Sequence, residues 1–205
     1  MQRAFLVTST KQWIKRQSTD HYVHQRVLFN YRSRSAFKLK EIIDKYKIKS
    51  KFSLDLGSAP GGWSQVLQEF SQVVAIDKIE MDPLKNVQFI NGSIQDQSVK
   101  DQLSMLTKKW DLITSDMSPS FSGNDTVDIS KSLELVQMAL DQCVNLNRNG
   151  TLICKFFQGH GQEEIKSKLD LQFKKVVHFK PKSSRSSSKE GYWICMGYKA
   201  PVNTF

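Results

Sequence analysis

The sequence predicts an α/β fold, an open and mostly parallel sheet with helices on both faces. Short apolar runs alternate with segments of helical periodicity along most of the chain, which is the pattern of strand–helix–strand units. The first of these runs ends in a glycine-rich turn that opens a helix, and the next run ends in an aspartate. Because open α/β sheets bind ligands at the carboxyl ends of their strands, this turn is the expected position of a site.

The glycine-rich turn lies within residues 52–64, FSLDLGSAPGGWS. Alternating apolar residues predict a buried strand over 52–56, and a helix is expected to start near Trp63. Free backbone N–H groups at a helix start, together with glycines that let a ligand approach closely, suit a nucleotide-like ligand. The residues that shape the turn are Gly57, Gly61, Gly62 and the stiffening Pro60.

The turn differs from the two common nucleotide-binding motifs. Its spacing is G-x-x-x-G-G rather than G-x-G-x-x-G, and no Gly-Lys-Ser/Thr follows it. Asp77 ends the apolar run at 73–76, where an acidic side chain can hold ribose hydroxyls. The two features together favour a nucleoside-type ligand over an ordinary tight strand–helix turn.

The remaining elements follow from periodicity and from turn residues. A helix running to about Tyr46 is expected to be capped by Ser33 or Ser35. The clearest helix spans 129–145, with an apolar stripe formed by Leu133, Val136, Leu140 and Val144. The last two strands are joined only by a loop, which predicts antiparallel neighbours. The other expected elements are strands over 73–77, 87–90, 110–116, 151–157, 173–179 and 192–198 and helices over 97–106 and 162–169.

Composition describes one soluble globular domain. The chain has 205 residues, of which 39% are hydrophobic and 24% charged, and this length allows a full core. No apolar run approaches the roughly 18 residues of a membrane span, so no membrane is expected as a partner. Cys143, Cys154 and Cys195 are odd in number and lie in apolar stretches, which predicts reduced core thiols rather than disulfides or a metal site.

The net charge of +10 is unevenly distributed. Residues 1–51 hold 13 Lys and Arg against three acidic residues, residues 52–154 hold seven against 13, and residues 155–205 hold ten against four. A basic front and back around an acidic middle suggest that the two ends face a polyanion while the middle holds a different ligand. The alternative is a basic protein whose charge serves solubility alone.

Three polar features stand out from the predicted elements. Asp116 ends an apolar strand at the position where ligands bind. Lys155 interrupts another apolar strand, which is costly unless the lysine is paired or functional, although an edge strand or a snorkelling stem would also accommodate it. Lys38 falls between core positions of its helix, where a solvated lysine is the default. The serine-rich basic loop over 180–189 suits phosphate binding or simple flexibility rather than a core.

The amino-terminal residues are basic. Residues 1–20 carry hydroxyl and basic side chains with no acid before Asp20, a composition typical of an organelle transit peptide and equally of an RNA-contacting arm. Residues 21–34 mix arginine and histidine with tyrosine, which suits phosphate contact and base stacking.

Several short motifs occur together along the chain. They are DLGSAPGGWSQ at 55–65, RSRSAFKL at 32–39, MDP at 81–83, SDMSP at 115–119, KFFQG at 155–159, SSR at 183–185 and SKE at 188–190. In this order the chain resembles the FtsJ/RrmJ ribosomal RNA 2′-O-ribose methyltransferases, from about Lys11 onward. The element around Trp13 and Asp20 is similar to the bacterial large-subunit enzyme and its mitochondrial relatives.

The resemblance implies a fold and a domain organisation. The expected fold is Rossmann-like, with a seven-stranded, mostly parallel sheet whose last strand is antiparallel. We expect residues 1–30 to form a basic arm or targeting leader and residues 31–205 to form a single methyltransferase domain. The resemblance also implies a catalytic tetrad, whose presence argues against an inactive paralogue. The tetrad falls on Lys38, Asp116, Lys155 and Glu190.

The resemblance further implies S-adenosyl-L-methionine as the cofactor. Gly61 and Trp63 are expected near its methionine end, Asp77 at the adenosine moiety and Asp116 at the methionine amino group. The complete expected cofactor-binding set is Gly57, Ala59, Pro60, Gly61, Gly62, Trp63, Asp77, Ser93, Ile94 and Asp116. The residues expected to bind RNA phosphates are Arg32, Arg34, Lys38, Lys182 and Arg185.

One position departs from the family pattern. The family often has an acid where Ser93 stands, and that acid contacts the adenine edge. Here the backbone or Asn91 has to serve, which predicts weaker cofactor affinity.

In the implied reaction a ribose 2′-hydroxyl attacks the sulfonium methyl group in line, so the protein mainly positions the groups and removes a proton. One hypothesis makes Lys155 the base in its neutral form, favoured by burial and by Lys38 and opposed by Asp116 and Glu190. The other keeps Lys155 cationic, steering the hydroxyl and stabilising developing oxyanion charge.

The expected function is 2′-O-ribose methylation of large-subunit ribosomal RNA, at a uridine in the peptidyl-transferase region, by a monomer that contributes to ribosome assembly. Ribosomal RNA or the pre-ribosomal large subunit is the expected partner. Mitochondria are the expected location, with the cytoplasm as the alternative for a bacterial protein. Three other functions compete: an RNA-binding assembly factor with dispensable catalysis, a methyltransferase of tRNA or another RNA, and a small-molecule methyltransferase, which the basic flanks disfavour.

Overall fold

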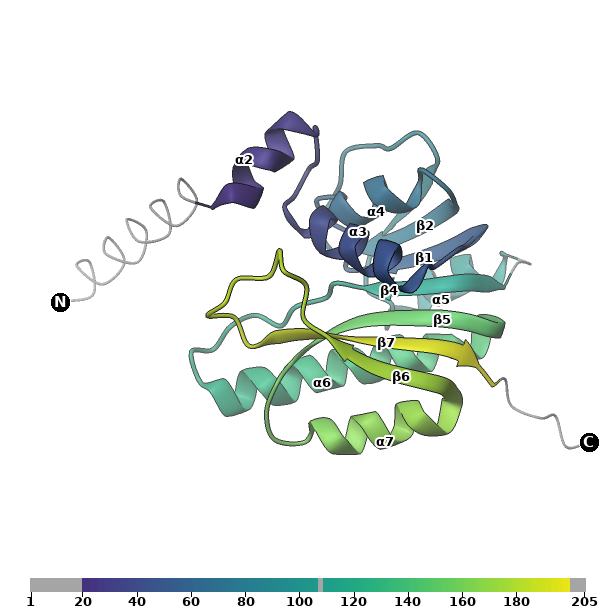
Figure 1. Ribbon diagram of the computed structural model, residues 1–205. Helices are drawn as coiled ribbons and strands as arrows, with labels where there is room; N and C mark the ends of the chain where they lie inside the picture. Colours follow the sequence, from purple (N-terminus) through teal and green to yellow (C-terminus); the bar gives the residue numbers. More distant parts are fainter. Residues whose placement is uncertain (1–19, 107–108, 200–205) are drawn as a thin grey trace, which may run out of the picture.

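A seven-stranded sheet with helices on both faces forms the centre of the protein (Figure 1). The computed structural model describes residues 20–106 and 109–199. The strands are β1 (Phe52–Leu56), β2 (Gln72–Asp77), β3 (Val87–Asn91), β4 (Trp110–Ser115), β5 (Leu146–Phe157), β6 (Phe173–Phe179) and β7 (Glu190–Tyr198). The helices are α2 (His21–Leu28), α3 (Ser35–Tyr46), α4 (Gly62–Leu67), α5 (Gln97–Ser104), α6 (Asp125–Asp141), the 3₁₀ helix η1 (Gln142–Asn145) and α7 (Gln162–Gln172).

The order of the strands is β3-β2-β1-β4-β5-β7-β6. All neighbouring pairs from β3 to β5 are parallel, whereas β7 is antiparallel to both β5 and β6. The Rossmann-like fold with a reversed last strand is therefore confirmed, as is the antiparallel pairing of the two final strands. Because β1, β2 and β4 are parallel neighbours, the turns that follow them meet at one edge of the sheet.

The two faces of the sheet are covered by different helices (Figure 1). One face packs against α3 and α4 through residues such as Leu39, Trp63 and Val73, and the other packs against α5, α6 and α7 through residues such as Leu54 and Val136. Alternate residues of each strand serve the two layers because successive strand side chains point to opposite faces.

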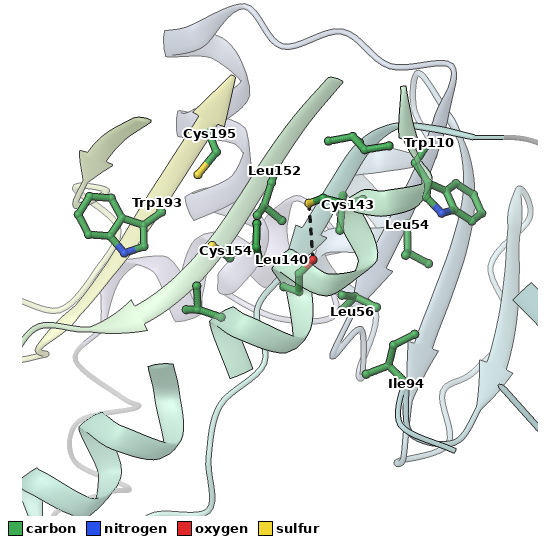
Figure 2. Packing of buried hydrophobic residues seen from close by; sticks show 14 of the residues in the cluster. Leu54, Leu56, Ile94, Trp110, Leu140, Cys143, Leu152, Cys154, Trp193 and Cys195 are labelled. Carbon is green, nitrogen blue, oxygen red and sulfur yellow. Dashed lines mark hydrogen bonds between the residues drawn. The ribbon is translucent and has the colours of Figure 1, made fainter. Parts of the chain in front are cut away.

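The three cysteines are free, buried thiols on the α6 side of the sheet (Figure 2). Figure 2 shows Cys154 and Cys195 on adjacent strands and Cys143 beside them, near Leu140. The thiol of Cys143 lies 3.7 Å from the carbonyl oxygen of Ala139. Burial raises the pKa of the Cys195 thiol well above its ordinary value, so these groups act as small core side chains.

Two local expectations are wrong. The α3 helix has Arg34 at its N-cap without a side-chain hydrogen bond, because the hydroxyls of Ser33 and Ser35 bond to each other at 2.6 Å. Val144 is 61% exposed, because α6 gives way to η1 after Asp141 and the change of pitch turns this position away from the core.

Helix α2 lies where the sequence indicated only a basic and aromatic arm. Asp20 caps it by accepting a hydrogen bond of 3.1 Å from the backbone N–H of Tyr22, and none of its residues is buried. Figure 1 shows α2 set apart from the sheet, beyond α3 and α4. Residues 1–19 of the expected arm or leader (residues 1–30) lie outside the described residues, and the domain boundary after residue 30 stays a prediction.

The loop between β6 and β7 is more ordered than its composition predicted. Pro181, Ser183 and Ser184 are buried, and the carboxylate of Glu41 on α3 accepts hydrogen bonds from the backbone N–H groups of Lys182 and Ser183 at 2.7 and 2.8 Å. The expectation of a loop that cannot pack is therefore wrong for its first half, because the half-buried carboxylate of Glu41 satisfies part of its backbone. Among the described residues, no helix is both long and apolar enough to cross a membrane.

Candidate active site

The four residues of the expected tetrad converge at the edge of the sheet where β1, β2 and β4 end. Asp116 follows β4 directly, and Lys155 lies near the end of β5. Glu190 is the first residue of β7, which starts at this edge because the strand is reversed. Lys38 reaches the same place from α3. Residues separated by more than 150 positions in the sequence thus form one cluster.

The tetrad forms two ion pairs. The Nζ of Lys38 lies 2.6 Å from Glu190 Oε1, and the Nζ of Lys155 lies 3.1 Å from Asp116 Oδ1. Lys155 also donates a hydrogen bond of 2.6 Å to the backbone carbonyl of Asp116. All four side chains are at most 17% exposed, so the charges interact with little screening by water.

Tyr192 links the two ion pairs, and the sequence analysis missed it. Its hydroxyl donates a hydrogen bond of 3.0 Å to Asp116 Oδ1, and the ammonium of Lys38 lies 5.9 Å from its ring centroid. Lys155 is its partner across β5 and β7. The signal was present in the sequence: Tyr192 follows Glu190 by two residues, so both point to the same face of a strand.

The electrostatics of the cluster keep Asp116 ionised. Burial alone would raise its pKa, but the charges of Lys155 and Lys38 and hydrogen bonds from Lys155 and Tyr192 outweigh that effect, and the pKa lies below its ordinary value. Burial and the nearby carboxylates of Asp116 and Glu190 raise the pKa of Tyr192 well above 10.0. Tyr192 is therefore a neutral hydrogen-bond donor at physiological pH.

The glycine-rich turn lies beside this cluster. Gly57 adopts φ +72°, and a Cβ there would stand 2.6 Å from the side chain of Met117, so the turn requires glycine. Asp77 holds the turn in place, because its Oδ2 accepts a hydrogen bond of 2.9 Å from the backbone N–H of Ala59. The next residue is Pro60, which follows a cis peptide bond, and Gly61 has φ +108°.

Helix α4 begins at Gly62 under tight steric constraint. A Cβ on Gly62 would lie 2.0 Å from the hydroxyl oxygen of Ser33. Trp63 follows, only 2% exposed, and its indole N–H donates a hydrogen bond of 2.9 Å to the carbonyl of Ser35. Its ring lies 5.6 Å from that of Tyr192. Trp63 therefore packs against Tyr192, which bonds to Asp116 of the tetrad. Its expected contact with the methionine end of the cofactor stays a prediction.

A buried carboxyl group lies under the turn. Asp55 is completely buried in β1 and accepts hydrogen bonds from Ser64 at 2.6 Å and from Thr114 at 2.9 Å. Burial raises its pKa to about 7, partly offset by these two hydroxyl donors and reinforced by the charges of Asp116 and Asp77. The group joins β1, β4 and α4, the three elements that position the site.

The segment after β3 supplies the rest of the expected cofactor pocket. Ile94 is buried in the core, at 6% exposure, so it presents only backbone to a ligand. The backbone N–H of Ser93 donates to Asp96 Oδ2 at 2.7 Å, which places a carboxylate close to the position where the family's acid is missing. The side-chain amide of Asn91 donates to the carbonyls of Asp77 and Lys78 at 3.2 and 3.3 Å, leaving its oxygen for a ligand.

The expected phosphate-binding residues have different surroundings. The guanidinium of Arg32 donates to the carbonyls of Asp82 and Pro83 at 2.6 and 2.8 Å and to that of Pro60 at 3.4 Å, so it ties the turn to the following loop. Lys182 is exposed. Arg34 and Arg185 both pair with Asp20, and Lys38 pairs with Glu190.

This geometry suits transfer of a group to a hydroxyl. A glycine turn, acidic residues at the ends of β2 and β4, and a lysine among carboxylates meet at one edge. The carboxylates of Asp77 and Asp116 at this edge suit a cationic nucleoside such as S-adenosyl-L-methionine. A hollow of about 450 Å³ beside Phe52, Gln72 and Trp110 lies at the opposite ends of the strands, away from these groups.

Comparison with known families decides what kind of enzyme this geometry belongs to. The FtsJ-like methyltransferase family model matches residues 31–198, which include the whole tetrad and the glycine turn. The chain belongs to the FtsJ-like methyltransferase family. The resemblance inferred from the motifs is therefore confirmed.

Several relatives are similar to this FtsJ-like methyltransferase over nearly its full length. A protein from Francisella philomiragia, named ribosomal RNA large subunit methyltransferase E, is 42% identical over 201 residues, which cover 94% of this chain and 98% of the relative. A protein of the same name from Francisella tularensis is 41% identical with the same coverage.

Two solved structures illustrate the fold. The crystal structure of a protein from Plasmodium falciparum, described as a ribosomal RNA methyltransferase, matches with a TM-score of 0.75 and 34% identity, covering 83% of this chain and 100% of that one. Human methyltransferase-like protein 13 in complex with SAH matches with a TM-score of 0.52 and 10% identity, covering 77% of this chain and 75% of that one. The second likeness concerns the fold alone.

These findings confirm two expectations. The protein is an enzyme, a methyltransferase, and its cofactor is S-adenosyl-L-methionine. The roles of individual site residues stay predictions, although the structure brings the four tetrad residues together and places the turn, Asp77 and Asp116 around one edge.

Proposed function

We propose that this methyltransferase modifies a ribose 2′-hydroxyl of large-subunit ribosomal RNA. The observation that carries the proposal is the two ion pairs, Lys38–Glu190 and Lys155–Asp116, whose side chains are little exposed and lie beside the glycine turn. The names of the Francisella relatives, both large-subunit methyltransferases, support the choice of RNA. The basic regions before and after the acidic middle of the chain support a polyanionic substrate.

The chain's own residues position the hydroxyl and manage its proton. S-adenosyl-L-methionine, when bound, supplies an intrinsically reactive methyl group. Lys155 is the proposed contact of the ribose oxygen, because its Nζ is held at a fixed point by two oxygens of Asp116. In one form its neutral amine accepts the proton, and in the other its cation stabilises the developing oxyanion. The Lys38–Glu190 ion pair is proposed to lie beside the ribose oxygen as well.

Transfer of tritium from S-adenosyl-L-methionine to RNA tests this proposal. Purified protein is incubated with large-subunit ribosomal RNA or with immature large subunits, beside a Lys155→Ala variant. Lys168→Ala is the matched control, because Lys168 makes an exposed i,i+4 ion pair on α7. We expect label in an alkali-resistant dinucleotide, because a methylated 2′-oxygen cannot attack the next phosphate. The label should be lost in Lys155→Ala and retained in Lys168→Ala.

Cofactor binding separates a catalytic defect from a folding defect. We expect Lys155→Ala to bind S-adenosyl-L-methionine nearly as well as the original protein in calorimetry, because Asp77 and the glycine turn are unchanged. If the original protein binds the cofactor but labels none of the RNAs, the result would contradict the proposal and would favour an assembly factor with dispensable catalysis.

The finer assignments are also part of the proposal. We propose a uridine of the peptidyl-transferase region as the target, a monomeric enzyme, a role in ribosome assembly and a mitochondrial location, with the bacterial cytoplasm as the alternative. Mapping of the alkali-resistant position identifies the nucleotide, and light scattering measures the mass of the protein in solution. Import of a reporter fused to residues 1–30 into isolated mitochondria supports the location, and failure of import favours the cytoplasm.

A further inference from the structure

Asp20 lies between two arginine side chains near the tetrad. Its Oδ2 is 2.8 Å from Arg34 Nη1 and 3.3 Å from Arg185 Nε. The side chains of Arg34 and Asp20 are 18% and 10% exposed, and that of Arg185 is 37% exposed. Two guanidinium groups that converge on one oxygen form the kind of site that binds carboxylates and phosphates.

The site contains more hydrogen-bond donors than Asp20 uses. Arg34 Nε and the hydroxyls of Ser183 and Ser184 are buried and have no hydrogen-bond partner within the described part of the chain. These serines directly precede Arg185, and Arg34 donates a hydrogen bond to the carbonyl of Ser183. A buried polar group without a partner is costly. A phosphate has more acceptor oxygens than the single oxygen, Oδ2, that Asp20 presents to the arginines, so it suits this group of donors.

The segment that carries Asp20 makes few buried contacts with the rest of the protein. Asp20 precedes α2, none of whose residues is buried. Besides the arginine pairs, α2 is held by a hydrogen bond of 2.9 Å from Arg26 to the carbonyl of Arg32 and by ring contacts such as that of Tyr22 with Phe37. Segments with few buried contacts open at low free-energy cost, so a competing anion can displace Asp20 without unfolding the sheet.

The anion site lies next to the proposed position of the target ribose. Arg34 precedes Lys38 by one turn of helix, so the two side chains lie on the same side of the helical segment. Arg185 belongs to the loop that leads into β7, whose first residue is Glu190, the partner of Lys38. An anion between Arg34 and Arg185 is therefore one helical turn away from the Lys38–Glu190 pair.

We propose that Arg34, Arg185, Ser183 and Ser184 form a binding site for a backbone phosphate of the RNA, and that Asp20 occupies this site in the free protein until the RNA displaces it. The inference rests on the proposed methylation of RNA and adds a competitor inside the enzyme. Asp20 lowers the affinity for RNA because each binding event must first break its two ion pairs. A polyanion that does not place a phosphate between Arg34 and Arg185 does not displace Asp20 and therefore binds weakly.

Removal of the charge of Asp20 tests the competition. Asp20→Asn keeps the cap of α2, because asparagine and aspartate are equally good N-caps, and it abolishes both ion pairs. Asp170→Asn is the matched control, since it changes the net charge equally and breaks an exposed ion pair with Lys166 on α7. Binding is measured by fluorescence anisotropy with a fluorescein-labelled fragment of large-subunit ribosomal RNA at several salt concentrations.

We expect Asp20→Asn to bind the RNA roughly 3- to 10-fold more tightly, with the larger gain at low salt, because salt screens the ion pairs of Asp20 that compete with the RNA in the original protein. Asp170→Asn should stay within about twofold of the original protein, since distant surface charges are screened. Addition of Arg185→Gln to Asp20→Asn should remove the gain, because the phosphate loses one of its two guanidinium partners.

Other outcomes overturn the inference. Unchanged or weaker RNA binding by Asp20→Asn, with a circular dichroism spectrum like that of the original protein, means that Asp20 orders the arm rather than competes with phosphate. An equal gain in Asp170→Asn means that net charge alone acts. If the original protein, Asp20→Asn and Asp170→Asn all fail to bind RNA but still bind S-adenosyl-L-methionine, the proposed function of methylating RNA is wrong. That result differs from one in which RNA binds but Asp20 does not compete with it.

Discussion

The hydroxyl of Tyr192 donates a hydrogen bond of 3.0 Å to Asp116, the same carboxylate that pairs with Lys155. Lys155 and Tyr192 are also direct partners across two antiparallel strands. Because β7 is reversed, it begins at the edge where the parallel strands end, and so it brings Glu190 and Tyr192 close to the glycine turn. The last strand in the sequence, β7, therefore supplies two residues of the site and also joins β5 to β6 in the sheet.

Tyr192→Phe should impair catalysis while preserving packing. The phenyl ring still lies on Trp63 and near Lys38, but Asp116 loses a donor that helps to hold its pKa below the ordinary value. We expect kcat to fall ~10-fold, as for loss of one positioned polar group, and the pKa of Asp116 to rise. Methylation rates and a carbon NMR titration of Asp116 measure the two effects. An unchanged pKa of Asp116 would contradict this role of Tyr192.

The stability of the protein should fall as the pH rises toward neutrality because of Asp55. Its pKa is raised from 3.8 to about 7, so the folded state holds a proton that the unfolded state releases near pH 4. The stabilisation is complete below the unfolded pKa and is lost as the pH rises through the folded pKa.

We expect Asp55 to lower the free energy of unfolding by ~3 kcal/mol between pH 5 and pH 8, since each pKa unit corresponds to ~1.4 kcal/mol. Asp55→Asn should remove most of this dependence. Urea unfolding at both pH values, beside Asp170→Asn as the control, measures it. A pH dependence equal to that of the original protein would exclude Asp55 as its source.

Gly62→Ala should be destabilising for a steric reason that a second substitution relieves. The new Cβ would lie 2.0 Å from Ser33 Oγ but 3.2 Å from Ser33 Cβ. We expect a cost of ~1–3 kcal/mol, as for overpacking elsewhere, and a much smaller cost when Gly62→Ala is combined with Ser33→Ala. Thermal unfolding of the two single variants and the double variant measures the coupling, and additive effects would contradict a direct clash.

Arg32→Lys should weaken cofactor binding. The guanidinium joins the carbonyl of Pro60 in the glycine turn to those of Asp82 and Pro83, and a lysine cannot reproduce this fork of donors. We expect the Kd for S-adenosyl-L-methionine to rise about 5- to 10-fold.

Lys182→Ala is the comparison for Arg32→Lys, because Lys182 is exposed and bonds to Glu41 through its backbone N–H, which the substitution keeps. It should lower RNA affinity and leave cofactor binding unchanged. Calorimetry with the cofactor and anisotropy with labelled RNA distinguish the two residues. If Arg32→Lys affects RNA alone, then Arg32 binds phosphate, as its basic character first indicated, and does not support the turn.

Much of the fold was predictable because strand and helix periodicities are local. Six of the seven strands were expected to within two residues of their observed bounds, whereas β5 begins at Leu146, five residues before its expected start. The loop between the last two strands was enough to predict their antiparallel pairing. The errors have tertiary causes. The hydroxyls of Ser33 and Ser35 bond to each other rather than cap α3, and Glu41 orders the loop before Arg185 from a distant helix.

The sequence by itself determined the class of the protein and predicted the four residues of its tetrad, because the glycine turn, the strand-end aspartates and the family motifs are readable one segment at a time. Only the tertiary structure decided the pairing of Lys38 with Glu190, the role of Tyr192 and the placement of Asp20 between two arginines. Those contacts join segments far apart in the chain. They depend on the order and direction of the strands and on side-chain burial, which local periodicity does not specify.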